Sequence, residues 1–423
     1  MSRIAVIGAG ISGMAAAYLL SRKHEVSLFE REPRLGGHTH THAIETSQGV
    51  LPIDTGFIVH NDRTYPNLVR LLQELGIERQ ASDMSFGVSC RQSGFEYSSR
   101  GLSGFFAGRR NWFRLGHYRF LAEIVRFNRE ARKLLQDPAN AEITLGDYLR
   151  ANQFSGDFIR YYLHPMAAAV WSTSLEEIEG FPAFTLIRFF ENHGLLGLTS
   201  APQWYVLRGG SSSYIPGLTA PYRDRICLAA KINGVTRTPA AVQISFQDRA
   251  PEHFDEIVFA CHAPQTMELL RDAKPLERQV LSGFHTSRNQ TVLHTDSTLL
   301  PRRLGARASW NYHLGTTRRA ATLTYHMNRL QGLPTPEDYC VTLNDTQSVD
   351  ETKILREMTY FHPLHTLEAV RAQARWSEIS GQNRTHFCGA YWFYGFHEDG
   401  LNSAIRVAES LGVSWESLRG VEG

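Results

Sequence analysis

Residues 4–13 read Ile-Ala-Val-Ile-Gly-Ala-Gly-Ile-Ser-Gly, an apolar run that leads into three closely spaced glycines. Gly8 permits a tight turn, Gly10 lets the backbone approach a diphosphate with no Cβ in the way, and Gly13 lets a helix lie against the preceding strand. A helix that begins near Ser12 would point free backbone N–H groups and the positive end of its dipole at that diphosphate. The stretch therefore predicts a dinucleotide-binding turn between a buried strand and a helix.

The residues after this turn complete a βαβ unit. Residues 14–20 continue the apolar helix, and Glu25-Val-Ser-Leu-Phe29 reads as a second strand that ends at Glu30. This acid follows the first glycine by about 20 residues, the spacing at which a carboxylate binds a ribose diol. A strand, a helix, a strand and an acid in register are far more specific than a lone GxGxxG motif.

A second glycine pair follows in Arg34-Leu-Gly-Gly-His38. It would let another loop close over the diphosphate, an extension that ordinary nicotinamide dehydrogenases lack, so the predicted cofactor is FAD. No second GxGxxG occurs downstream. A built-in NAD(P)H domain is therefore not expected, and electrons would leave for oxygen, for a quinone-like acceptor or back into the substrate.

The C-terminal stretch at residues 385–400 has the features of a second cofactor contact. A strand that ends near Cys388, a glycine, a loop and a new helix near Glu398 would place backbone donors where reduced flavin gathers negative charge. His397 is the first candidate for a catalytic or flavin-tuning role, with a purely structural role as the alternative. Glu398 and Asp399 have a second interpretation, in which they cap this helix.

These stretches resemble the flavin-containing amine oxidase superfamily, which includes monoamine oxidases, protoporphyrinogen oxidases and phytoene desaturases. The pair Gly209-Gly210 resembles the point at which such enzymes re-enter their FAD domain. Residues 53–59, 324–331 and 395–400 resemble, more narrowly, a bacterial branch associated with cyclopropane, methylated and furan fatty-acid metabolism.

The pattern and the resemblance together assign a set of residues to FAD. The resemblance implies that the backbone near Val235 touches the adenine, and that FAD is bound non-covalently, since no cysteine stands where monoamine oxidases attach it. The predicted cofactor-binding residues are Gly8, Gly10, Ile11, Ser12, Gly13, Glu30, Arg31, Gly36, Gly37, His38, Thr55, Gly56, Phe57, Val235, Ala260, Gly389, Ala390, Glu398, Asp399 and Gly400.

The predicted fold class is α/β, with two domains because 423 residues exceed what one core usually holds. A Rossmann-like FAD-binding domain of the glutathione reductase type takes residues 1–57, 209–265 and 380–423, with further strands expected at 226–230, 241–246 and 256–260. An amine oxidase-like substrate domain of mixed α+β structure takes residues 58–208 and 266–379. The first of these insertions reads as helical, and the second begins with a helix and then alternates like the strands of a sheet that roofs the flavin.

Composition limits the functional classes. A net charge of +2 is too small for a nucleic-acid-binding protein. The five cysteines are widely spread with no CxxC, which argues against a disulfide scaffold or a zinc site and predicts a reducing cytoplasm. Residues 4–20 are apolar enough for a signal peptide, but their glycines have nucleotide-loop spacing. His38, His40 and His42 alternate as metal ligands would, yet their place after the glycine pair favours a position near the cofactor, and no metal is predicted.

Residues 101–133 interleave aromatic and basic side chains, with eight Lys and Arg against two Glu. The favoured interpretation is a helix that faces the core along Phe113, Phe120, Ile124, Phe127 and Ala131 and leaves its basic side in solvent. The alternative is peripheral contact with an anionic membrane, at the inner face of the bilayer.

The predicted function is an FAD-dependent oxidoreductase that oxidises or desaturates a fatty-acyl or lipid chain by hydride transfer to the flavin. Alternatives are a redox-neutral double-bond isomerase, an amine oxidase, and a non-catalytic flavin-binding partner protein. Amine oxidases generally keep a lysine in a substrate-domain strand that reaches the flavin, whereas the comparable stretch here, residues 288–293, has none.

Overall fold

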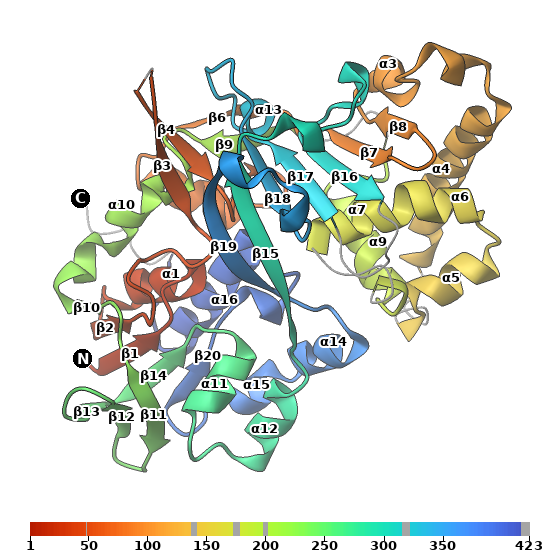
Figure 1. The fold of residues 1–423 in the computed structure, drawn as a ribbon. Helices are drawn as coiled ribbons and strands as arrows, with labels where there is room; N and C mark the ends of the chain where they lie inside the picture. Colours follow the sequence, from red (N-terminus) through yellow and green to blue (C-terminus); the bar gives the residue numbers. More distant parts are fainter. Residues whose placement is uncertain (48, 137–141, 172–177, 198–201, 315–321, 416–423) are drawn as a thin grey trace, which may run out of the picture.

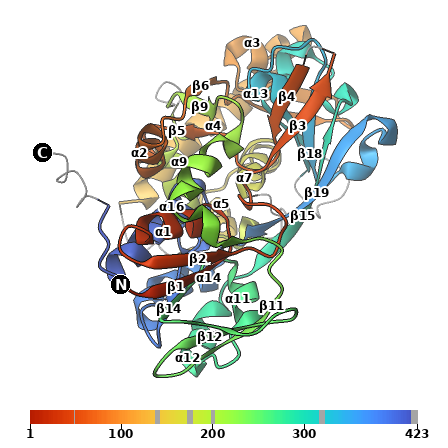
Figure 2. The ribbon, with the colours of Figure 1, turned by 90° about the vertical axis from the view of Figure 1, so that its left-hand side faces the viewer.

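The computed structural model describes residues 1–47, 49–136, 142–171, 178–197, 202–314 and 322–415 (Figure 1). Its two largest sheets are a five-stranded parallel sheet and a seven-stranded mixed sheet. In the views of Figures 1 and 2 these sheets lie at different ends of the molecule, and the long strands β15 and β19 reach from one toward the other. This arrangement confirms the predicted α/β fold class.

The parallel sheet has the strand order β10-β2-β1-β14-β20. Ile4 and Val6 of its central strand pack under two helices, while Ala5 and Ile7 belong to the apolar cluster on the opposite face. Because both faces are covered, β1 is apolar throughout. The elements of this layer are β1 (Arg3–Ile7), α1 (Ile11–Leu20), β2 (Glu25–Phe29), β10 (Ile226–Cys227), β14 (Glu256–Phe259), β20 (Thr385–Phe387) and α16 (His397–Ser410).

A three-stranded antiparallel sheet and four short helices surround the other face of the parallel sheet. They are β11 (Ile232–Arg237), β12 (Val242–Phe246), β13 (Glu252–Phe254), α11 (Ala263–Leu269), α12 (Pro275–Leu281), α14 (Leu367–Ala374) and α15 (Trp376–Ile379). The predicted strand at 226–230 is wrong beyond Cys227, because Ala229 turns the chain with a φ of 50°. The strand that follows is β11, which the sequence analysis missed.

The seven-stranded sheet has the order β19-β15-β18-β17-β16-β7-β8 and is antiparallel except where β16 pairs with β7. We call this mixed sheet the roof, after the sheet predicted to lie over the flavin, and that position relative to a flavin stays a prediction. Its strands are β7 (Phe86–Cys90), β8 (Phe95–Ser98), β15 (Thr286–His294), β16 (Trp310–Leu314), β17 (Thr322–His326), β18 (Cys340–Leu343) and β19 (Ile354–Pro363).

Most helices of residues 58–208 share one apolar core with this sheet. They are α3 (Gly101–Phe105), α4 (Leu115–Leu134), α5 (Leu145–Ala151), α6 (Gly156–Phe158), α7 (His164–Trp171) and α9 (Ala183–Asn192). The helix α2 (Pro66–Glu74) packs instead in the apolar cluster of α1 and α16, and the 3-10 turn η1 (Arg109–Phe113) directly precedes α4. A purely helical insertion was an incomplete prediction, since β7, β8 and the small sheet β5-β9-β6 also come from it. The strands of that small sheet are β5 (His60–Asn61), β6 (Arg79–Ser82) and β9 (Trp204–Leu207).

The strands of each large sheet come from a different set of chain segments. All five parallel strands lie within residues 1–57, 209–265 and 380–423, and all seven roof strands lie within 58–208 and 266–379. The division into two domains at these boundaries stays a prediction. A separate antiparallel hairpin of β3 (Thr41–Thr46) and β4 (Gly49–Asp54) follows the second glycine pair.

The apolar stripe of α4 faces the core as predicted along Phe120, Ile124, Phe127 and Ala131. Phe113 was wrongly included, because it precedes α4 and its side chain is exposed. Within the described ranges, no helix has the length and apolar character needed to cross a bilayer.

Candidate functional site

The turn between β1 and α1 has the tight geometry that its glycines predict. Gly8 has a φ of 105°, and a Cβ on Gly13 would lie 1.8 Å from the carbonyl oxygen of Gly8. A Cβ on Gly10 would meet nothing within 4 Å. The first glycine makes the turn and the third packs the helix, whereas Gly10 borders open space at the N-terminus of α1, where a diphosphate would fit.

Glu30 is directed at this turn from the end of β2. One carboxylate oxygen accepts from the backbone N–H of Ala9 at 2.7 Å, and the other accepts from the N–H of Glu32 at 2.9 Å. These bonds fix the carboxylate beside the glycines, the place that a ribose diol requires. Arg31 is exposed and pairs with Glu32 at 3.3 Å.

The second glycine pair lies against the first turn. Gly36 donates its N–H to the carbonyl oxygen of Ala9 at 2.8 Å, and a Cβ on Gly37 would lie 3.1 Å from the Cα of Gly10. The two loops therefore border the same space. Their approach, together with the open side of Gly10, fits the diphosphate of FAD.

The loop after this pair is bonded to residues 55–57. The N–H of Phe57 donates to the carbonyl oxygen of His38 at 2.8 Å, and a Cβ on Gly56 would lie 2.1 Å from that same oxygen. The hydroxyl of Thr55 lies 2.7 Å from that of Tyr360 in the roof. Phe57 stacks on His397 with ring centroids 3.6 Å apart. Predicted site residues from both ends of the chain thus lie side by side.

His397 is buried at the first turn of α16, where its Nε2 lies 2.9 Å from Thr39 Oγ1 and 3.4 Å from the hydroxyl of Tyr214. Burial lowers the pKa of His397 to about 3, so the imidazole is neutral at pH 7. These contacts join α16 to the loop after the glycine pair. A catalytic role for His397 stays a prediction.

The start of α16 packs directly on the start of α1. A Cβ on Gly400 would lie 2.7 Å from Ile11 and 2.8 Å from Ser12. Just before this helix, Gly389 donates its N–H to Ser403 Oγ at 2.8 Å, and Ala390 begins a short 3-10 turn. Two helix N-termini therefore point at neighbouring parts of one site.

The capping interpretation is right for Asp399 and wrong for Glu398. Asp399 accepts from the N–H of Phe396 at 2.9 Å, at the start of its own helix. Glu398 instead caps α2, accepting from the N–H groups of Asn67 at 3.0 Å and Leu68 at 2.9 Å. This long-range contact has no signal in the local sequence. Cofactor contact by either residue stays a prediction.

Val235 and Ala260 lie near the ends of β1 and β2. Val235 is in the apolar cluster that contains Phe29, and its carbonyl oxygen accepts from Arg271. Ala260 packs on Gly13, with 3.0 Å between its Cβ and a Cβ built there. Adenine contact at Val235 is likewise still a prediction.

Three histidines from separate segments gather beside the glycine pair. The ring centroid of His38 is 6.2 Å from that of His262 and 5.3 Å from that of His362. Asn289 of β15 lies with its amide nitrogen 3.1 Å from Nδ1 of His362. Burial lowers the pKa of His262 and of His362 to about 4 and that of His38 well below its ordinary value. This region is therefore lined by neutral imidazoles, to which the roof contributes His362 of β19 together with the amide of Asn289, and β15 carries no lysine.

These imidazoles predict an acid-sensitive fold. Unfolding restores the ordinary pKa near 6.5, so the unfolded chain takes up protons that the folded chain does not bind, and the free energy of unfolding falls as the pH drops from about 6.5 to about 4. A shift from 6.5 to about 4 is worth at most about 3 kcal/mol per imidazole. Urea unfolding of the apoprotein at several pH values checks this. The variant His262→Gln should flatten the dependence, and equal stability at pH 7 and pH 5 would contradict it.

His40 and His42 lie beyond this cluster on the way into β3. Their ring centroids are 4.0 Å apart, but His40 bonds the hydroxyl of Tyr360 and His42 bonds Thr55 Oγ1. Over the ranges that the structure describes, no group of three or more His, Cys, Asp or Glu is placed to hold a metal ion.

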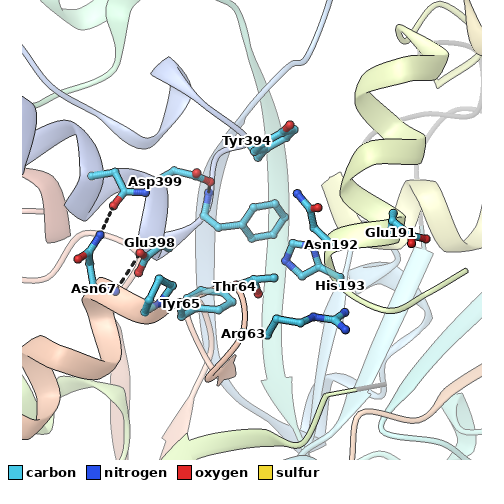
Figure 3. Close-up of a pocket in the computed structure, with 13 residues that line it drawn as sticks. Arg63, Thr64, Tyr65, Asn67, Glu191, Asn192, His193, Tyr394, Glu398 and Asp399 are labelled. Carbon is cyan, nitrogen blue, oxygen red and sulfur yellow. Dashed lines mark hydrogen bonds between the residues drawn. The ribbon is translucent and has the colours of Figure 1, made fainter. Parts of the chain in front are cut away.

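A pocket of about 580 Å³ begins at the first turn of α16 (Figure 3). Figure 3 shows Tyr65 and His193 below Tyr394, with Glu191 and Asn192 at the far side. The lining residues come from the start of α2, the end of α9, the loop before α16 and α16 itself: Arg63, Thr64, Tyr65, Pro66, Asn67, Glu191, Asn192, His193, Tyr394, Phe396, Glu398, Asp399 and Asn402.

Sequence reasoning missed His193, the most informative side chain of this pocket. Its Nδ1 lies 2.9 Å from the carbonyl oxygen of Phe189, which can only accept, so Nδ1 carries the proton and Nε2 holds a free lone pair. The ring stacks on Phe189 with centroids 3.7 Å apart and lies 5.8 Å from Phe396. Burial lowers the pKa of His193 to about 4, which keeps it neutral. The position of His193 beside Phe396 depends on how α9 packs against the start of α16, which no local sequence pattern indicates.

The chain matches the family model described as flavin containing amine oxidoreductase over residues 11–297. The fold is similar to that of an engineered putrescine oxidase, with a TM-score of 0.71 and 13% identity over 98% of this chain and 99% of that one. It is also similar to cyclohexylamine oxidase from Brevibacterium oxydans, with a TM-score of 0.68 and 15% identity over 97% and 99% of the two chains.

A third similar structure is a CLA-producing fatty acid isomerase from P. acnes, with a TM-score of 0.69 and 15% identity over 96% of this chain and 98% of that one. At such identities these likenesses show a shared fold. The family match spans well over half of the chain and includes the start of α1, β2 and the second glycine pair. The chain therefore belongs to the flavin-containing amine oxidoreductase family, whose members use a flavin.

Proposed function

We propose that the protein binds FAD non-covalently and oxidises or desaturates a fatty-acyl or other apolar chain. The observation that carries this proposal is the position of the pocket, which begins at the same first turn of α16 that packs on α1. Tyr65, His193 and Phe396 give it an aromatic wall. Such a wall excludes water from an apolar carbon chain and from the reacting atoms.

The carboxylates of the pocket favour an acyl chain over an amine. Glu398 accepts two backbone N–H bonds, and Asp399 accepts one. Burial raises the pKa of Asp399 to about 7, so it is partly protonated at neutral pH. Glu191, at the far side, is paired with Arg132 at 2.9 Å. Each of these three carboxylates therefore already has a partner within the protein.

Bound FAD would supply a hydride acceptor. The residues that we propose would hold it are the two glycine turns, Glu30 and the start of α16. We assign to His193 the acceptance of the substrate proton, because its side chain lines the pocket and the carbonyl of Phe189 fixes the tautomer whose Nε2 can accept a proton.

Replacing His193 tests this assignment. His193→Phe keeps the stack on Phe189 but removes the proton acceptor, so turnover should fall by about 100-fold, the usual contribution of a positioned base. Flavin content and thermal stability of the His193→Phe variant should stay unchanged. His253 lies on β13, and the surface control His253→Gln should turn over substrate as fast as the wild type. If turnover in the His193→Phe variant is unchanged, His193 does not accept the substrate proton.

Anaerobic titration of the yellow holoprotein tests the reaction itself. Bleaching of the flavin spectrum by an unsaturated fatty acid, and not by primary amines, is the expected result. Bleaching by amines alone would make the protein an amine oxidase, and no bleaching with either would leave a flavin-bearing partner protein. Release of the flavin on acid precipitation would establish that it is not covalently attached. Lipid analysis of cells with and without the protein then identifies the chain that changes.

Redox-neutral double-bond isomerisation is the second candidate. It is supported by the structural likeness to the fatty acid isomerase and by the absence of a second GxGxxG in the sequence. Product formed under anaerobic conditions with no added acceptor would favour isomerisation. A strict need for an acceptor would favour desaturation.

A further inference from the structure

Four aliphatic and aromatic side chains stand out from the surface at one end of the molecule. The exposed fractions are 89% for Phe113, 81% for Leu115, 73% for Leu304 and 63% for Leu102. They come from η1, the first residue of α4, the short turn η7 (Leu304–Ala306) and α3. Figures 1 and 2 both place α3 far from β1 and β2. We call these four residues and their basic neighbours the α3 surface.

The two chain segments of the α3 surface are held together by hydrogen bonds from side chains to backbone carbonyls. Ser98 Oγ donates to the carbonyl oxygen of Gly305 at 2.8 Å, and an Arg100 guanidinium nitrogen lies 3.5 Å from the carbonyl oxygen of Arg307. A Cβ on Gly305 would lie 3.9 Å from Ala107. Residues that are far apart in sequence therefore form one continuous face.

Packing underneath fixes the direction of the exposed side chains. Trp112 stacks on the buried Phe106 with ring centroids 4.3 Å apart, and Tyr118 packs on the other part of Phe106 at 5.3 Å. The hydroxyl of Tyr118 donates to the carbonyl oxygen of Trp112 at 2.9 Å. Trp112 and Tyr118, which flank Phe113 and Leu115 in the sequence, thus pack on Phe106, while Phe113 and Leu115 themselves stay exposed.

The charged residues around these side chains are predominantly arginines. Residues 97–122 contain five arginines and no Asp or Glu, and residues 297–307 contain three arginines and no Asp or Glu. Arg114 and Arg119 are exposed beside Phe113 and Leu115. Two of the arginines are paired with acids, Arg303 with Glu96 at 3.3 Å and Arg307 with Asp338 at 3.8 Å. Apolar side chains ringed by cations match an anionic bilayer, whose headgroups attract the arginines and whose acyl region accepts the apolar groups.

We propose that the α3 surface docks on an anionic lipid bilayer. A second copy of this chain would oppose arginines to arginines, so self-association through this face is disfavoured. The helix α4 begins in the α3 surface and, near its other end, Arg132 pairs with Glu191 of the pocket at 2.9 Å. One rigid helix thus joins the docking face to the pocket, and a bilayer is a source of the acyl chains that the proposed function requires.

Co-sedimentation with vesicles tests this inference. Full-length holoprotein should sediment with vesicles of equimolar phosphatidylglycerol and phosphatidylcholine at low salt, and not with phosphatidylcholine alone. The double variant Phe113→Ser, Leu115→Ser should lower the bound fraction at least about fivefold without changing the melting temperature, since both side chains are exposed. Arg114→Gln with Arg119→Gln should weaken binding and reduce its salt dependence.

Matched controls come from exposed residues elsewhere. Val50→Ser and Arg208→Gln remove an exposed apolar and an exposed basic side chain outside the α3 surface and should leave vesicle binding unchanged. The inference is overturned if the wild-type protein does not sediment with anionic vesicles. It is also overturned if the Phe113→Ser, Leu115→Ser variant binds these vesicles as well as the wild type. It is equally overturned if ultracentrifugation shows a dimer that the Ser double variant abolishes, since the occupant would then be a second copy.

The experiment measures binding without turnover. Failure to bind vesicles would leave the proposed reaction standing. Failure to react with acyl chains would leave the docking surface standing.

Discussion

Gly10→Ala is expected to weaken flavin binding severely while the apoprotein stays folded. A Cβ at this position meets nothing within 4 Å, and the φ of −71° suits alanine. The new methyl group would occupy the open side of the turn, where the proposed diphosphate must approach the backbone. Affinity for FAD should fall by about 1,000-fold, or about 4 kcal/mol.

Two further glycine variants make this prediction specific. Gly13→Ala places a methyl group 1.8 Å from the carbonyl oxygen of Gly8, so it should destabilise the apoprotein itself. Gly116→Ala in α4, which also meets nothing within 4 Å, should change neither property. Reconstitution of each apoprotein with FAD, followed by absorbance and thermal melting, separates the cases. If the Gly10→Ala protein is yellow and binds FAD with wild-type affinity, the proposal that the diphosphate lies at this turn is wrong.

The second large effect is expected at Arg237, whose guanidinium joins β11 to two other elements. It lies 2.5 Å from one oxygen of Glu277 and 2.8 Å from the other, and its Nη1 lies 3.1 Å from the hydroxyl of Thr385. The exposed fractions of the paired side chains are 2% and 3%. Glu277→Leu leaves the arginine charge buried, with Asp272 as its remaining acidic partner, and should lower the free energy of unfolding by about 3–5 kcal/mol.

The double variant Arg237→Met, Glu277→Leu removes both charges and should recover much of this loss, because the cost arises from an uncompensated buried charge. Arg150→Met, which removes an exposed partner of Asp147 on α5, serves as the control and should not shift the urea midpoint. Urea unfolding of the apoproteins followed by circular dichroism measures all three. Equal stability of the Glu277→Leu variant and the wild type would contradict a structural role for this pair.

Local patterns were sufficient for the elements that begin the cofactor site. The apolar run before Gly8, the helix after it and the strand that ends at Glu30 all lie where periodicity and glycine spacing predict them. The predicted C-terminal helix likewise begins at His397. Each of these signals is contained within a few neighbouring residues.

The features that were missed depend on contacts across the chain. β11 contains Asn233 and Gly234 and is stabilised by pairing with β12, so its own composition gives little sign of a strand. Asp54 is buried and accepts from Ser211 N–H at 2.9 Å and from Gln331 at 3.0 Å, which ties three distant segments together. The capping of α2 by Glu398 arises in the same way, whereas the tautomer of His193 is set locally by the carbonyl of Phe189, four residues earlier. Local patterns in a single sequence do not show which distant residues become partners in the fold.

The parallel sheet also constrains the order of events during synthesis. β1 is made first, but its helix α1 is covered only when α16 packs on it, and β14 gains its second neighbour only when β20 is made. Until those last segments leave the ribosome, the nascent chain must keep apolar surface of its first strand and helix from aggregating. The nucleotide is therefore expected to enter after translation, and a prematurely terminated chain should be a client of chaperones and proteases rather than a partly active flavoprotein.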